Sequence, residues 1–262
     1  MGKNIYLSKQ EQMIFNSISS IDIIPINEIK NMFPLLKSYQ VNKICSSLSL
    51  KGYLYRLKKG VYLVQKKPSD TAIIKNPYRI ALTLFKGYIG FSSALRLYDL
   101  LDYEPFTIFV ISKNESAEKR IGEYTFKSVA VGKKSMGIAY YKNVYTSSLP
   151  KTFFDCFYKP QYSGGYSTVT KALSDADFDW DEFITYFEFA SDSLCQRTGY
   201  VLDLLKRETG DIPENVLQYL EKRIKNNTKL LPSGSGKGVY IKKWKVLDNL
   251  GKENILSWWY HG

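Results

Sequence analysis

Apolar residues in the first seventy positions recur at helical spacing in three separate stretches. In the first stretch, Ser8 and Glu11 form a capping-box pattern, in which each side chain can satisfy the backbone amide of the other residue. The pattern predicts a helix that begins after Ser8 and places Met13, Ile14 and Ile18 on one face.

A second, short helix is predicted between Pro25 and Pro34, and a third from about Ser38 to Lys51, where Gly52 suits the position after a helix end. One face of the third helix is apolar and consists of Val41, Ile44, Cys45 and Leu48. The opposite face carries hydrogen-bond donors and no carboxylate. These donors are Lys37 and Ser38 at the start of the helix, followed by Tyr39, Asn42, Lys43 and Ser46.

Two β-rich runs, 53–57 and 61–64, flank the turn Lys58-Lys59-Gly60 and predict a hairpin. Three helices followed by a basic hairpin are typical of a winged helix-turn-helix domain, expected over residues 1–68. The third helix would enter the major groove of double-stranded DNA, while Arg56, Lys58 and Lys59 would reach phosphates or the minor groove. A solvated helix face, or a winged helix that docks a protein, are the alternatives.

Residues 69–262 are expected to form a second, α+β domain. Alternating apolar positions predict a mixed sheet over about 88–146, with strands at 88–90, 106–111, 123–131 and 138–146, and a helix capped by Ser92. Helical patterns follow over about 150–226. A Gly/Ser-rich turn then leads to a basic strand and a short helix over 239–257.

The net charge of +12 indicates a polyanionic partner, and its distribution favours the first domain. Residues 1–70 contain eleven Lys/Arg and four Asp/Glu, whereas the remaining 192 residues contain 26 and 21. Three widely spaced cysteines and one histidine, His261, provide neither a disulfide framework nor a metal-binding motif, and they argue against Ser-His or Cys-His catalysis. We therefore expect no catalytic residues, no metal and no cofactor.

Two motifs suggest nucleotide chemistry, but both lack the required context. The turn 234–238 has Gly and Lys at positions like those of a phosphate loop, but a strand is predicted after it instead of a helix. Asp175 and Asp177, after Gly164-Gly165, resemble the carboxylate pair of nucleotidyltransferases, although they fall in an acidic loop instead of a strand. A nucleic-acid- or nucleotide-modifying enzyme that uses these two aspartates is the alternative function.

The chain has no run of 18 apolar residues, and its N-terminus, Met1-Gly2-Lys3-Asn4-Ile5, lacks the apolar core of a secretory signal. These features predict a cytoplasmic protein without a membrane anchor.

Four segments, in order, resemble the AbiEi family of antitoxins. They are 52–62 in the predicted wing, 88–95, 149–165 with its Lys-Thr, Asp-Cys and Gly-Gly pairs, and 231–246 with Leu-Pro-Ser-Gly and Lys-Lys-Trp-Lys-Val. Together the resemblance extends over about residues 8–250.

This resemblance implies a type IV toxin–antitoxin system. The winged helix would repress its own promoter through inverted repeats, and the second domain would counteract a nucleotidyltransferase-like toxin without a stable complex. Its candidate residues are Lys151, Asp155, Lys237, Lys242 and Lys243. A stand-alone regulator without a toxin is the alternative, and the oligomeric state stays open, including a monomer that binds DNA cooperatively. Contact with RNA by the second domain also stays open.

Overall fold

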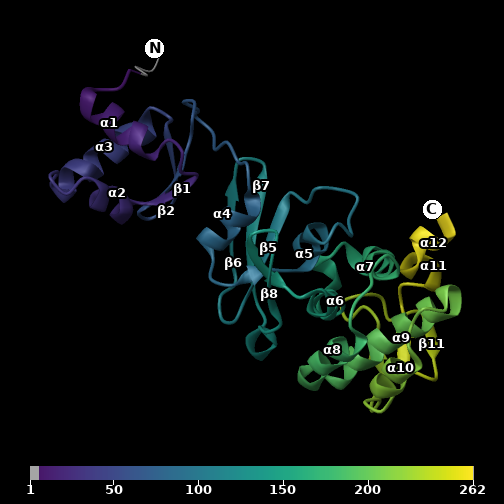
Figure 1. The fold of residues 1–262 in the computed structure, drawn as a ribbon. Coiled ribbons are helices and arrows are strands. Elements are labelled where there is room, and N and C mark those ends of the chain that lie inside the picture. Colours follow the sequence, from purple (N-terminus) through teal and green to yellow (C-terminus); the bar gives the residue numbers. More distant parts are fainter. Residues whose placement is uncertain (1–5, 262) are drawn as a thin grey trace. The chain divides into compact units, whose positions relative to one another are not determined.

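The computed structural model describes residues 6–261, without the side chain of His261. The chain divides into two compact units, residues 1–84 with 119–126 and residues 85–118 with 127–262. Each unit combines helices and strands, so the protein belongs to the expected α+β class (Figure 1). Residues 1–5, which carried the expectation about a secretory signal, and the His261 side chain lie outside the described part. Within residues 6–261, no helix is long and apolar enough to cross a membrane.

The first unit contains the three predicted helices and the predicted hairpin, followed by one more helix. The helices are α1 (Lys9–Ile18), α2 (Ile26–Met32), α3 (Ser38–Leu50) and α4 (Pro77–Leu84). The strands are β1 (Ile23–Pro25), β2 (Leu54–Lys58) and β3 (Val61–Val64), which form one sheet in the order β1-β3-β2. Because α4 contacts β2, the first unit extends to residue 84, beyond the domain boundary expected after residue 68.

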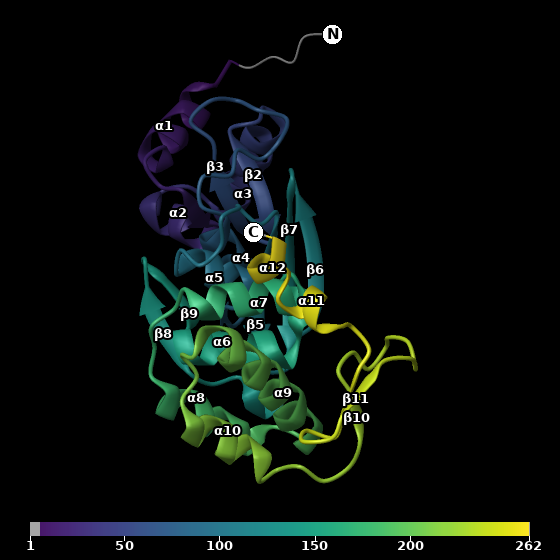
Figure 2. The ribbon, with the colours of Figure 1, turned by 90° about the vertical axis from the view of Figure 1, so that its right-hand side faces the viewer.

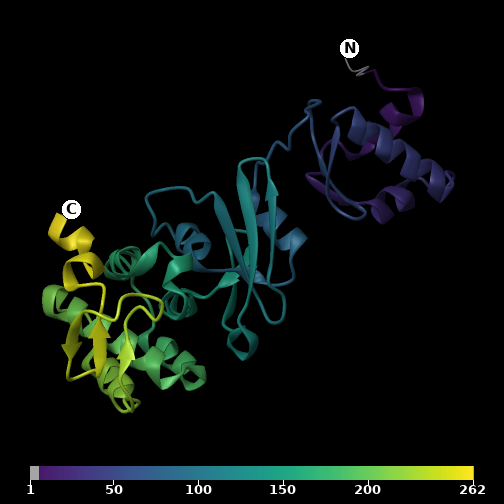
Figure 3. The same ribbon diagram turned by 180° about the vertical axis from the view of Figure 1, so that it is seen from behind.

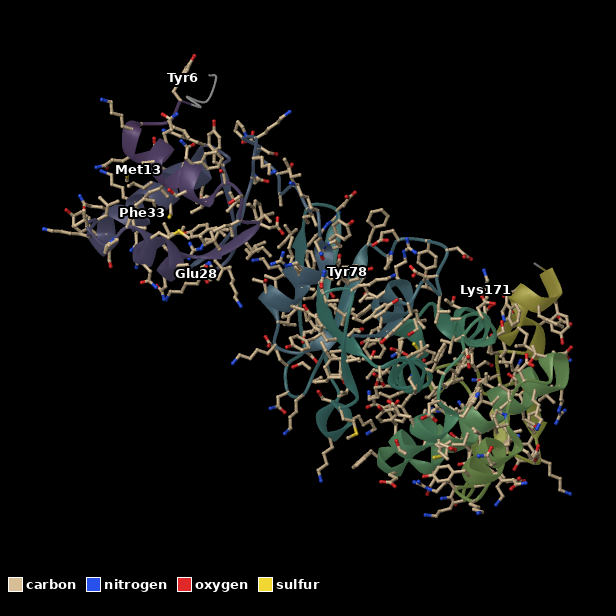
Figure 4. The ribbon with its side chains drawn as sticks, viewed as in Figure 1. Tyr6, Met13, Glu28, Phe33, Tyr78 and Lys171 are labelled. Carbon is tan, nitrogen blue, oxygen red and sulfur yellow. The ribbon has the colours of Figure 1, made fainter. Side chains whose placement is uncertain are left out.

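The core of the first unit forms where the apolar faces of α1, α2 and α3 meet the sheet. Ile14, Ile29, Val41 and Cys45 are completely buried there. Met13 was expected on the same face but is 44% exposed, so that expectation is wrong (Figure 4). Successive residues of a helix lie about 100° apart, and only Ile14 of the adjacent pair faces the core.

A six-stranded sheet organises the chain between residues 88 and 147, in the order β6-β7-β5-β4-β9-β8. Its strands are β4 (Tyr88–Ile89), β5 (Thr107–Ser112), β6 (Ala117–Ile121), β7 (Tyr124–Ala130), β8 (Ile138–Tyr141) and β9 (Val144–Ser147). The single strand expected over 138–146 is instead the hairpin β8–β9, because Lys142 and Asn143 form its turn with φ angles of 45° and 63°. The helix expected to be capped by Ser92 begins two residues earlier, with Gly90 as its cap, and the Ser93 hydroxyl accepts a hydrogen bond from the amide of Phe109.

The helical part of the second unit packs around one core. Its helices are α5 (Phe91–Leu97), α6 (Leu149–Tyr158), α7 (Gly165–Ser174), α8 (Trp180–Thr185), α9 (Asp192–Thr209), α10 (Glu214–Glu221), α11 (Lys252–Ile255) and α12 (Ser257–His261). Phe153, Phe154 and Phe157 of α6 are buried against Phe183 and Phe187. The two last helices lie along α7 (Figure 2).

A small sheet near the C-terminus consists of β10 (Thr228–Lys229), β12 (Val246–Asp248) and β11 (Val239–Ile241), in that order (Figure 3). The basic strand expected over 239–246 is therefore wrong as one element, since residues 242–245 turn back between β11 and β12. Within this turn Trp244 is completely buried against Gly199 of α9, where a Cβ atom would lie 2.1 Å from the indole ring. This close packing fixes the small sheet on α9.

Candidate nucleic-acid interface

The outer face of α3 carries the residues that the sequence singled out. Tyr39 is 64% exposed, and the side chains of Asn42 and Lys43 are exposed beside it. None of these three side chains makes a hydrogen bond or ion pair with another described residue. They are therefore available to an external partner.

At both ends of this face, residues of α3 make hydrogen bonds within the protein. Lys37 and Ser38 are exposed at the start of α3, where the Lys37 amide donates to the side chain of Gln40 at 2.8 Å and so fixes the first turn. The Ser46 hydroxyl already donates to the carbonyl of Asn42 at 2.9 Å. Ser46 keeps only acceptor capacity for a partner.

A buried carboxylate fastens α3 to α1. Glu11 accepts hydrogen bonds from Ser8 at 2.6 Å, from Ser47 at 2.5 Å and from the Lys51 ammonium at 2.8 Å. Burial by itself raises the pKa of Glu11, but these hydrogen bonds outweigh burial and lower the pKa to about 2. Glu11 is therefore ionised and paired at neutral pH, and the capping box predicted from Ser8 and Glu11 is confirmed.

The β2–β3 hairpin presents three exposed cations with different surroundings, Arg56 within β2 and Lys58 and Lys59 at the turn. Arg56 and Lys59 make no hydrogen bond or ion pair with other described residues. The Lys58 ammonium instead donates to the carbonyl of Thr83, at the C-terminal end of α4, where the helix dipole favours a positive charge. Lys119 likewise donates to the carbonyl of Leu57. No sequence signal could have revealed Lys119, because 62 residues separate it from its acceptor.

The surface of α3 and the hairpin is positively charged because it lacks acidic residues as well as because it carries basic ones. Residues 29–69, which include α3 and the hairpin, contain nine Lys/Arg and no Asp or Glu. The nearby carboxylate of Glu11 is paired with Lys51 and is only 7% exposed. The exposed charge of α3 and the hairpin is therefore uniformly positive.

The five candidate residues of the second unit do not form one surface. Lys151 and Asp155 are completely buried and paired with each other within α6. Burial lowers the pKa of Lys151 and raises the pKa of Asp155 to about 6. These two candidate side chains are therefore not exposed at the surface of the second unit, and each has the other as its ionic partner.

The other three candidates are exposed lysines. Lys237 lies in the loop before β11, and Lys242 follows this strand. Lys243 pairs with Asp203 at 3.1 Å and lies over the Trp244 ring, so part of its side chain serves packing.

The two sequence motifs that resemble nucleotide-binding sites, Asp175 with Asp177 and the turn 234–238, lie outside helices and strands. Asp175 ends α7, and Asp177 is exposed between α7 and α8. Within residues 6–261, no group of three His, Cys, Asp or Glu side chains is arranged to hold a metal ion. The turn 234–238 leads into β11, as expected, and no helix follows it.

Comparison with known proteins shows the fold without assigning a family. No protein-family profile matches the chain, and no curated protein matches it in sequence. The crystal structure of the Rv2827c protein from Mycobacterium tuberculosis is similar, with a TM-score of 0.71 over 97% of this chain and 96% of that one. Sequence identity is 14%, so the likeness shows a common α+β fold over nearly the full length.

Proposed function

We propose that this protein is a sequence-specific DNA-binding transcriptional repressor. In this proposal, α1–α3 and the β2–β3 hairpin form a winged helix-turn-helix domain with α3 as the recognition helix. The observation that carries the proposal is the donor-rich, acid-free outer face of α3 beside an equally acid-free basic hairpin.

The dimensions of α3 suit the major groove. Its 13 residues make a helix about 20 Å long, and the groove, about 12 Å wide, admits one helix. The inner face of α3 is packed into the core, and Glu11 ties its C-terminal end to α1. A recognition helix needs this rigid support, because base contacts tolerate little displacement.

Each exposed residue has a role that follows from its chemistry. Asn42 has both a donor and an acceptor and can pair with an adenine edge. Lys43 and Tyr39 beside it would contact bases or nearby phosphates. Arg56 and Lys59 would contact the phosphate backbone, which positions the protein without reading sequence.

A pair of variants separates these roles. Asn42→Ala should reduce affinity for the operator by about 1–3 kcal/mol, which is roughly fivefold to 150-fold, and leave binding to random DNA almost unchanged. Lys59→Ala should weaken binding to both DNAs equally and reduce the slope of log affinity against log salt by about one. Lys222→Ala, which removes one exposed charge from the residue that follows α10, is the matched control.

Fluorescence anisotropy with labelled operator and random duplexes measures both effects. Equal losses on the two DNAs for Asn42→Ala would remove base reading from α3. A salt slope unchanged by Lys59→Ala would remove the hairpin tip from the interface. If neither DNA binds the unaltered protein, the domain is better interpreted as a protein-docking module.

The wider biological role is also proposed. We infer a cytoplasmic regulator that binds inverted repeats in its own promoter and counteracts a nucleotidyltransferase-like toxin without a stable complex. The order of the four segments that resemble AbiEi antitoxins supports this inference. Co-expression with the product of an adjacent toxin-like gene tests it: restored growth is expected, with no complex in pull-downs, and continued growth arrest would leave a stand-alone regulator.

A further inference from the structure

A pocket of about 530 Å³ lies in the second unit, and none of its lining residues belongs to the proposed DNA-binding set. Its walls come from the end of α6, the turn 159–161, the start of α7, one residue of α9, the segment 230–233 and Leu250. Two of these segments, 159–165 and 231–233, fall within stretches that the sequence singled out and that the proposed function does not use. A volume of this size is typical of small-molecule sites.

The pocket carries two cations and no carboxylate. Lys159 and Arg197 line it, and none of its lining residues is Asp or Glu. The second unit has four arginines, and Arg96, Arg207 and Arg223 are each paired with a carboxylate. Arg197 makes no such pair, and its Nε atom is buried without a hydrogen-bond partner among the described residues.

An unsatisfied guanidinium nitrogen in a protein interior is costly, because the group loses water and gains no acceptor. The charge of Arg197 also acts on its surroundings: burial raises the pKa of Tyr166 to about 12, and Arg197 opposes this rise. The Lys159 ammonium makes no hydrogen bond or ion pair with a described residue and lies 5.1 Å from the ring centre of Tyr158 and 5.8 Å from that of Tyr162. Both cations are therefore free to receive an anion.

The first backbone amides of α7, in the wall of the pocket, have no capping side chain. α7 begins at Gly165, and its N-cap, Gly164, has no side chain to accept from the first free amides. A Cβ atom at Gly165 would meet nothing within 4 Å. Free amides beside an arginine and a lysine are suited to a phosphate group.

The remaining lining is apolar and aromatic, with two polar groups at its rim. The apolar side chains include Phe157, Tyr158, Tyr166, Leu230, Leu231 and Leu250. Gln161 and Ser233 are exposed and can hydrogen-bond a ligand. An aromatic and apolar lining with amide and hydroxyl groups at its rim suits a nucleoside better than an acyl chain, which has no polar edge to pair with them.

We propose that this pocket binds a nucleoside monophosphate, with Arg197 and Lys159 holding the phosphate and the aromatic and leucine side chains enclosing the nucleoside. The site is independent of the DNA-binding proposal, since it shares no residue with α3 or the hairpin.

Isothermal titration of the full-length protein with AMP, GMP, CMP and UMP tests the site, with adenosine and inorganic phosphate as partial ligands. At least one nucleotide should bind saturably, and both partial ligands should bind at least tenfold more weakly. Hydrogen exchange should then slow in the peptides that contain 157–166 and 230–233. Absence of saturable binding by all four nucleotides would overturn the proposal. Equal binding of adenosine would overturn the phosphate assignment, and equal binding of inorganic phosphate would overturn the nucleoside assignment.

Variants on α9 locate the site. Arg197→Met retains the aliphatic stem and removes an uncompensated charge, so it should leave the melting temperature unchanged or raised while nucleotide affinity falls at least tenfold. Arg207→Met on the same helix, 63% exposed, is the matched control and should bind normally. Lys159→Gln should weaken nucleotide binding as well. Normal binding by both pocket variants would place the ligand elsewhere and refute the proposal.

Discussion

The ionised Glu11 is expected to stabilise the first unit substantially, and Glu11→Gln measures this contribution. Its side chain is 7% exposed and accepts hydrogen bonds from Ser8, Ser47 and Lys51. The pKa lies at about 2 in the folded protein, against 4.5 for an unperturbed glutamate. A difference of this size corresponds to about 3 kcal/mol at neutral pH.

The sign of the pH dependence follows from the direction of the pKa shift. Because folding lowers this pKa, the stabilisation is complete above about pH 4.5 and is lost as the pH falls toward 2. Glu11→Gln should therefore destabilise the first unit by about 2–3 kcal/mol at pH 7, and by progressively less below pH 4.5. Glu28→Gln, at an exposed position on α2, is the control and should have little effect (Figure 4).

Urea unfolding at pH 7, 5 and 3 provides the assay, with two optical probes in parallel. All four tryptophans lie beyond residue 179, so their fluorescence reports only on the second unit, whereas far-ultraviolet circular dichroism reports on both. The variant should shift part of the dichroism transition and leave the fluorescence transition unchanged. An equally large difference between variant and unaltered protein at pH 3 and pH 7 would refute the assigned role of the carboxylate charge.

Three further predictions concern the second unit and the thiols. Asp155→Asn leaves the buried ammonium of Lys151 without a counter-charge, so it should lower the free energy of unfolding by about 3–5 kcal/mol. Urea unfolding followed by tryptophan fluorescence measures this loss, and a loss below about 1 kcal/mol would contradict the buried pair. Gly199→Ala should cost more than about 1 kcal/mol in the same assay, because the added Cβ would lie 2.1 Å from the Trp244 ring, and an unchanged midpoint would contradict this packing. All three cysteines are buried with thiol pKa values raised to about 11 or 12, so none should react with iodoacetamide at pH 8 until the protein unfolds; rapid alkylation of the native protein would disprove their burial.

The sequence pattern located the elements of the first unit well because local signals there agree with the tertiary packing. Ser8 and Glu11 formed the predicted capping box, and the predicted start of the third helix at Ser38 was correct. The strand β1 was missed, since three residues ending in proline carry too little periodicity to identify a strand.

In the second unit, the local sequence pattern predicted two parts of the large sheet incorrectly, and each error has a physical reason. The turn in β8–β9 uses Lys142 and Asn143 at positive φ without a glycine to mark it. The strand β6 was missed because Glu118, Lys119 and Arg120 make it as charged as a loop, as is common at a sheet edge.

Ion pairs and pockets inside the second unit could not be predicted from sequence. A lysine such as Lys151 is almost always exposed, and only tertiary structure shows that it is buried beside Asp155. The nucleotide pocket likewise assembles residues separated by up to 93 positions, from Phe157 to Leu250. By contrast, the exposed face of α3 could be predicted, because its apolar face is defined within the helix itself.

Binding of the full-length protein to the DNA upstream of its own gene tests the central claim most directly. A labelled upstream duplex and a shuffled duplex of the same composition should be titrated by fluorescence anisotropy at several salt concentrations. We expect the upstream DNA to bind roughly a thousandfold or more tightly than the shuffled DNA, with log affinity falling linearly against log salt. Equal affinity for the two duplexes at every salt concentration would contradict a sequence-specific repressor.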